Sequence, residues 1–123
     1  MGFLFAQNAI SIYKNEAKSF DIQVSKNSGI VYDLTTSVVY VSVRKKITDE
    51  YTIISKSSAN PLEISISLPR TGVIRIFFLP QDTKLVDPGI YTYDVWVVDA
   101  TNSEQFPAIE PSEFEVKSSV TRF

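Results

Sequence analysis

The stretch that decides the fold is LVDPGIYTY, residues 85–93. Pro88 has a fixed φ and Gly89 tolerates a positive φ, so the pair predicts a tight turn between two segments of the chain. After the turn, Tyr91 and Tyr93 alternate with Ile90 and Thr92, and the alternation continues to Val98, which is the period of an extended strand. We expect a turn that leads into a strand, with both tyrosines facing the core.

The same alternation of apolar and polar residues dominates the rest of the chain. It recurs in residues 20–25, 39–44, 62–68 and 74–79, and weaker runs occupy residues 10–13, 51–55 and 114–120. The run 62–68 has the most regular pattern of a half-buried strand, and turn-forming residues separate the runs. We therefore predict an all-β protein of about seven to nine strands. At most one short helical turn is expected, at residues 81–85, where Asp82 or Thr83 would cap it.

The composition is that of one globular domain covering residues 1–123, with 44% apolar and 21% charged residues. The formal net charge is -2, and no basic cluster is longer than Arg44, Lys45 and Lys46, which argues against nucleic-acid binding. The chain has no cysteine and no histidine, which excludes disulfides, thiol nucleophiles and Cys/His zinc sites. We expect no metal and no cofactor.

The amino-terminal segment is apolar but has no export signal. It lacks the basic region of a signal peptide, its apolar run is too short, and we expect no transmembrane segment and no membrane partner. Phe3, Leu4 and Phe5 have two interpretations. Residues 1–8 act as an arm that docks on a neighbouring subunit, or they extend the first strand and cover the chain's own core.

The turn at residues 85–93 resembles the corner between strands E and F of immunoglobulin domains, written L-x-D-x-G-x-Y-x-C. Leu85, Asp87, Gly89 and Tyr91 match that pattern, with Pro88 inside it, and Tyr93 stands in place of the cysteine. The resemblance implies an immunoglobulin-like antiparallel β-sandwich and a tyrosine corner, in which the Tyr91 hydroxyl binds a backbone group upstream. Without the disulfide, aliphatic and aromatic packing alone would hold the two sheets together.

Across most of its length the chain also resembles small virion proteins of tailed bacteriophages, which are single immunoglobulin-like modules. The similarity lies in short motifs whose order and spacing agree: Asp33-Leu34-Thr35 after Gly29, Val41-Ser42-Val43-Arg44, Gly72, Asp82-Thr83, Pro88-Gly89, Tyr91 to Val95, Phe114-Glu115-Val116 and Val120-Thr121-Arg122. Ser112 and Glu113 depart from the pattern, which often has glycine there. The resemblance implies a virion component of the head, neck, baseplate or fibre attachment.

Several apolar residues are expected to point away from the core and form an interface. Trp96 and Val98 lie on the strand face opposite Tyr91 and Tyr93. On an earlier strand, Phe77 and Leu79 are also apolar residues that are expected to point away from the core. An outward tryptophan is a common interface anchor. The alternative interpretation is that Trp96 packs on Phe77 or Leu79, or under a loop.

Nothing in the sequence predicts catalysis. Four aspartates cluster in sequence, Asp82, Asp87, Asp94 and Asp99, but strand alternation spreads them over different faces and no calcium-loop pattern occurs. No serine lies in a nucleophile motif. We expect turn-capping or solvated roles for these carboxylates, and we expect the protein not to be an enzyme.

The sequence therefore predicts a non-enzymatic virion structural protein, assembled in the host cytoplasm, whose partners are other virion proteins and identical copies. The alternative is a carbohydrate- or host-surface-binding module, for which Trp96, Tyr40 or Tyr51 would be exposed.

Overall fold

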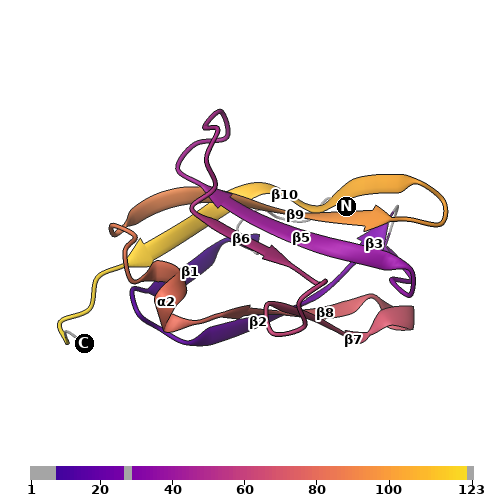
Figure 1. Ribbon diagram of the computed structural model, residues 1–123, viewed down its shortest axis with the longest axis horizontal. Helices are drawn as coiled ribbons and strands as arrows, with labels where there is room; N and C mark the ends of the chain where they lie inside the picture. The colour runs from indigo at the N-terminus through magenta and orange to yellow at the C-terminus, as the bar shows by residue number, and fades with distance from the viewer. Residues whose placement is uncertain (1–7, 27–28, 122–123) are drawn as a thin grey trace.

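The computed structural model describes residues 8–26 and 29–121, which form a two-layered β-sandwich (Figure 1). The strands, in chain order, are β1 (Ile10–Tyr13), β2 (Lys18–Gln23), β3 (Ser25–Lys26), β4 (Ile30–Val31), β5 (Ser37–Arg44), β6 (Ile54–Ser57), β7 (Ile64–Leu68), β8 (Val73–Phe78), β9 (Gly89–Asp99) and β10 (Glu104–Lys117). Two short helical turns flank β8, namely η1 (Pro69–Thr71) and α2 (Pro80–Thr83). Phe3, Leu4 and Phe5 lie outside the described residues.

The strands form two packed sheets and a small hairpin. The five-stranded sheet has the order β1-β10-β9-β5-β6, the three-stranded sheet has the order β2-β8-β7, and β3 pairs with β4. This is the predicted all-β, immunoglobulin-like sandwich, with eight strands in the two main sheets. One pair departs from the antiparallel pattern, because β1 runs parallel to β10. The chain leaves β1 for the other sheet instead of folding back as a hairpin, so no turn imposes an antiparallel partner.

Apolar residues at alternate positions of β5 and β9 fill the space between the sheets. The inward residues of β9 are Tyr91, Tyr93, Val95 and Val97, and those of β5 are Val39, Val41 and Val43; all seven are buried. The prediction from alternation is confirmed for these two strands, which pair from Ser37 and Asp99 to Arg44 and Thr92. They form the centre of the five-stranded sheet together with β10.

The run at residues 62–68 is buried less than its alternation predicts. Ile64 is fully buried, but Leu62 is 77% exposed and Leu68 is 57% exposed. Leu62 belongs to the turn before β7, where its backbone N–H donates to the Asn60 side chain at 3.0 Å. The pairing of β7 with β8 also shifts register between Ser65 and Leu68, which takes Leu68 out of the buried face.

A chain of aromatic rings joins the two sheets. From the five-stranded sheet, Tyr93 packs edge-on against Phe114 with ring centres 6.1 Å apart. Phe114 then contacts Phe78 of the other sheet at 5.4 Å, and Phe78 contacts Phe20 at 5.9 Å. These rings connect β9 and β10 to β8 and β2, so aromatic packing crosses the core between the sheets. Tyr93, in the cysteine position of the immunoglobulin pattern, starts this chain.

The predicted tyrosine corner is present. The Tyr91 hydroxyl donates a hydrogen bond of 2.6 Å to the backbone carbonyl of Asp87, four residues upstream. Burial, and secondarily the negative charge of Asp87, raise the pKa of Tyr91, so the hydroxyl remains a donor at neutral pH. The bond fixes the connection from α2 to β9 against the end of the core.

We expect Tyr91→Phe to lower the free energy of unfolding by about 1 kcal/mol, the net value of a typical hydrogen bond, because the ring stays and only the bond is lost. Chemical denaturation measures the change. Tyr51→Phe is the matched control, since Tyr51 is 82% exposed and should lose nothing. Equal stabilities of the wild type and Tyr91→Phe would contradict a stabilising corner.

Leu85 and Gly89 also belong to the predicted corner, and Leu85 lies outside the core. Leu85 is 92% exposed, and the inward positions are Thr83, which is fully buried, and Val86, which packs against the core. The reason is the turn after α2, in which the Val86 N–H donates to the Thr83 carbonyl and turns Leu85 toward solvent. Gly89 has the expected positive φ, 158°, a backbone conformation that residues with a side chain rarely adopt.

The glycine that the fold requires is Gly72, in the turn between β7 and β8. Its φ is 70°, and a Cβ atom added there would lie 2.6 Å from the Val24 carbonyl oxygen and 2.8 Å from that of Tyr32. The Val24 N–H also donates to the Gly72 carbonyl at 2.7 Å. Only glycine fits this close approach of three backbone segments.

Candidate binding face

Apolar side chains lie in two rows on the outer face of the five-stranded sheet. Trp96 on β9 lies between Tyr40 on β5 and Pro107 on β10, and Val98 lies between Val38 and Gln105. Trp96 and Val98 are half-buried and Tyr40 is 43% exposed. The outward position predicted for Trp96 is confirmed. We call this region the apolar half of the face; it consists of Val38, Tyr40, Trp96, Val98 and Pro107.

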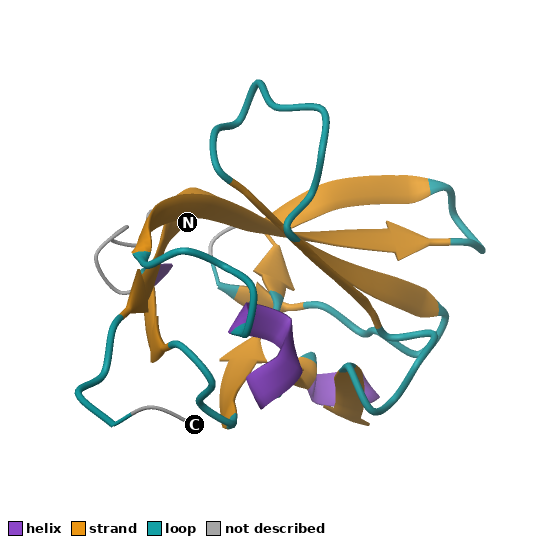
Figure 2. Ribbon diagram, turned by 60° about the vertical axis from the view of Figure 1, so that its left-hand side comes forward, coloured by secondary structure: helices purple, strands orange, loops and turns teal. Residues whose placement is uncertain are grey.

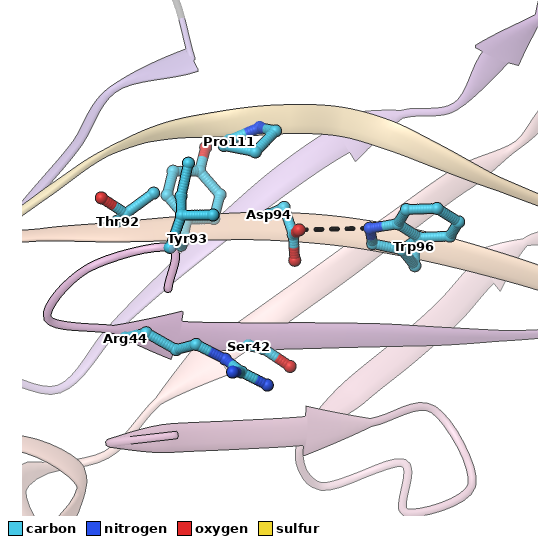
Figure 3. Close-up of a pocket in the computed structure, with 8 residues that line it drawn as sticks. Ser42, Arg44, Thr92, Tyr93, Asp94, Trp96 and Pro111 are labelled. Carbon is cyan, nitrogen blue, oxygen red and sulfur yellow. Dashed lines mark hydrogen bonds between the residues drawn. The ribbon is translucent and has the colours of Figure 1, made fainter. Parts of the chain in front are cut away.

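A hollow of about 290 Å³ opens beside the apolar half, on the same face (Figure 3). Its lining comes from β5, β9, β10 and the loop of residues 45–53 that joins β5 to β6. The lining residues are Ser42, Arg44, Ile47, Thr92, Tyr93, Asp94, Trp96 and Pro111. Because they come from three stretches of the chain, residues 42–47, residues 92–96 and Pro111, no single sequence motif marks this hollow.

Hydrogen bonds orient the polar groups of the hollow. The Trp96 Nε1–H donates to Asp94 Oδ2 at 3.1 Å, and the Arg44 guanidinium donates to the Asp49 carbonyl. The side-chain ion pairs between described residues are Lys56–Asp82 and Arg75–Asp21, so Arg44 and Asp94 line one hollow without pairing. At its base, burial raises the pKa of Tyr93 to about 12. The hollow thus presents a cation, an anion and an indole ring together.

The loop of residues 45–53 projects away from the sandwich at the edge of the hollow (Figure 2). Ile47 is 64% exposed and Tyr51 is 82% exposed, although both are large apolar residues. The loop is held at its base, since the Lys46 N–H donates to the Asp49 carboxylate at 3.1 Å and the Ile53 N–H donates to the Val43 carbonyl at 2.7 Å. Uncovered apolar groups on a projecting loop indicate a contact site.

The predicted interface residues do not form one surface. Phe77 and Leu79 belong to the end of β8 and the residue that follows it, in the three-stranded sheet. The outer faces of the two sheets point in opposite directions (Figure 1), so Trp96 does not pack on either residue. The interpretation that Trp96 packs on Phe77 or Leu79 was wrong. Alternation predicts which face of its own sheet a residue occupies, but it does not predict which sheet the strand joins.

A buried ion pair joins the five-stranded sheet to α2, and the sequence did not predict it. Lys56 is 5% exposed and points inward from the edge strand β6. Its Nζ lies 2.7 Å from Asp82 Oδ2 and 5.4 Å from the centre of the Phe78 ring. Asp82 also accepts the Leu79 N–H at 2.8 Å and so caps α2. An inward charge on an edge strand disfavours pairing with a further strand.

Asp99 ties the loops at the other end of the sheet together. Its carboxylate accepts the hydroxyls of Tyr32 and Thr36 at 2.9 Å, and the Thr101 hydroxyl and N–H at 2.8 and 3.0 Å. These hydrogen bonds, led by Thr101, hold the pKa of Asp99 well below its usual range although burial opposes the shift. Asp82 and Asp99 thus have the capping roles expected for the clustered aspartates.

No protein-family model and no curated protein sequence matches the chain. Within residues 8–26 and 29–121, no group of three or more acidic side chains is arranged to hold a metal ion, and no helix is long and apolar enough to cross a membrane. The features that bear on function are therefore those of the outer face of the five-stranded sheet.

Proposed function

We propose that this chain is a non-enzymatic structural module of a tailed-phage virion, which assembles through the outer face of its five-stranded sheet. The observation that carries the proposal is the apolar half of that face, continuous with a hollow and flanked by a loop with exposed Ile47 and Tyr51. Tryptophan and tyrosine surrounded by polar groups are the usual composition of the centre and rim of a protein interface.

The polar groups of the hollow support binding more than catalysis. A hydroxyl nucleophile needs an adjacent base, and the hydrogen bond of the Asp94 carboxylate goes to the Trp96 indole, not to Ser42 or Thr92. Such a bond orients the ring and the carboxylate. It prepares a shaped surface for a partner.

A virion suits a module of this kind because its components are repeated. A standard interface buries about 800 Å² on each partner, and the apolar half with the hollow spans three of the five strands and continues into the loop. Many copies arranged by the symmetry of a particle would bind by avidity, even if each contact were weak. The resemblance to small virion proteins agrees with this mode of assembly.

We expect Val98→Glu to reduce incorporation into particles that lack the protein by about tenfold or more, the equivalent of about 1.4 kcal/mol. Val98 is half-buried and points outward, so a carboxylate there would be desolvated by a partner but tolerated by the free chain. Ser67→Glu is the matched control, because Ser67 is exposed on β7 of the other sheet. Normal incorporation of Val98→Glu would remove this face from the proposal.

The second candidate is a carbohydrate-binding module, and the hollow is the observation that favours it. Trp96 could stack on a sugar ring while Arg44 and Asp94 bind its hydroxyls, as polar groups in a mostly apolar site do. Trp96→Ala separates the two functions, since it would abolish particle incorporation in one case and glycan binding in the other. Trp96 is the only tryptophan of the chain, so its fluorescence during titration with methyl glycosides reports on the hollow directly.

A further inference from the structure

We infer that the outer face of the five-stranded sheet pairs with the same face of a second copy of this chain, around a two-fold axis that runs along β9. The inference rests on the proposed function and names the partner that occupies the face. It is carried by charges of opposite sign on the two sides of β9, which is the central strand of that sheet.

The charges lie in one row across three neighbouring strands. Thr92 on β9 pairs with Arg44 on β5 on one side and with Glu113 on β10 on the other. All three side chains point outward, because their neighbours Val43, Tyr93 and Phe114 are buried. The acidic side continues along β10 with Glu115 and the basic side continues with the exposed Lys46. We call these the acidic flank (Glu113 and Glu115) and the basic flank (Arg44 and Lys46).

A two-fold axis along β9 exchanges the two flanks. Arg44 of one copy then faces the partner's Glu113, and the same contact occurs a second time by symmetry, as in any isologous interface. A two-fold axis running across the strands at Thr92 would instead place β10 on β10 and set the acidic flanks against each other. Opposite charges at an interface favour the correct register and suppress the wrong one. The charge pattern therefore selects the first arrangement.

The positions of the apolar residues are consistent with the same two-fold axis along β9. Trp96 lies on β9 and would meet its own copy, while Tyr40 on one side of β9 would meet the partner's Pro107 from the other side. The projecting loop, on the side of β5 and β6, would reach the partner's β10 and β1. Apolar residues are exposed at that end of the sheet as well: Tyr13 of β1 is 44% exposed, and Ile90 of the neighbouring β9 is 50% exposed. Ile47 and Tyr51 of the loop would thus contact apolar residues of the partner.

Asp94 lies on β9 and would approach the partner's Asp94, which is an unfavourable contact of this arrangement. Arg44 of each copy lines the same hollow as Asp94, so both carboxylates have a cation in the enclosed space. The two hollows, each of about 290 Å³, would face each other and leave room for bridging water. The repulsion is therefore screened.

Charge reversal tests the inference. The variants are Arg44→Glu and Glu113→Arg, and sedimentation of the purified chain measures self-association. We expect the wild type to dimerise, each variant alone to dimerise about tenfold or more weakly, and an equimolar mixture of the two to form a heterodimer again. Arg70→Glu, an exposed charge reversal in η1 of the other sheet, is the control and should dimerise like the wild type.

Two results would overturn the inference: a monomeric wild type at the highest soluble concentration, or no heterodimer in the mixture. Glu113 is exposed, so Glu113→Arg should fold even if Arg44→Glu disturbs the loop through its bond to Asp49. In that case Lys46→Glu replaces Arg44→Glu as the second member of the pair. A monomeric wild type together with loss of incorporation by Val98→Glu would leave the proposed function intact, with a different virion protein as the partner.

Discussion

Phe114→Ala should lower the free energy of unfolding by about 3–5 kcal/mol, the usual cost of removing a phenylalanine from a packed core. Phe114 is fully buried and contacts Tyr93 of its own sheet and Phe78 of the other. No disulfide can join the sheets, since the chain has no cysteine, so this ring contributes much of the contact between them. Urea denaturation of the wild type and the variant measures the difference.

Phe77→Ala is the control for this prediction. Phe77 precedes Phe78 on β8 but points outward and is half-buried, so its removal leaves no enclosed cavity. We expect a loss less than half that of Phe114→Ala. Similar losses for the two variants would mean that the chain of aromatic rings contributes no more to stability than the outer surface does.

Asp82→Ala should lower the free energy of unfolding by about 3 kcal/mol, because it leaves a buried ammonium group without its partner. Lys56 is 5% exposed and its Nζ has Asp82 at 2.7 Å. The same substitution removes the acceptor for the Leu79 N–H at the start of α2. Chemical denaturation of the wild type and the variant measures the loss.

Lys56→Met tests whether removing the cation of this ion pair costs less stability than removing the carboxylate. Methionine keeps an apolar chain over the Phe78 ring, and the Asp82 carboxylate that remains is 18% exposed and still accepts the Leu79 N–H. We expect a loss of about 1 kcal/mol or less, since replacing a buried charge by an apolar group of similar volume is often neutral. A larger loss for Lys56→Met than for Asp82→Ala would contradict the explanation that an unpaired buried ammonium group destabilises the Asp82→Ala variant.

The sequence predicted those features that depend on neighbours along one strand. The alternation around Tyr91, Tyr93 and Trp96 correctly separated inward from outward residues, because successive side chains of any strand point to opposite faces. The tyrosine corner was also predicted, since its donor and acceptor are four residues apart. Local geometry is sufficient for both.

Other predictions failed because they needed the neighbours of each segment in space. Lys56 was not predicted as a core residue, although its alternation with Ser55 and Ser57 puts it on the inward face with Ile54. Leu62 was expected on the buried side of a strand, but it lies in a turn that exposes it to solvent, and so does Leu85. Phe77 was grouped with Trp96, although their strands belong to different sheets.

By itself, the sequence determined that the chain forms a sandwich of alternating strands without a disulfide, with Trp96 on an outer face. Period-two alternation and single turns encode these features, because they depend on residues only a few positions apart. The tertiary structure alone decided that Arg44, Thr92 and Glu113 form one row, and that Lys56 meets Asp82 across the core. Those contacts depend on which strands become neighbours, and that choice is made by the packing of the whole core.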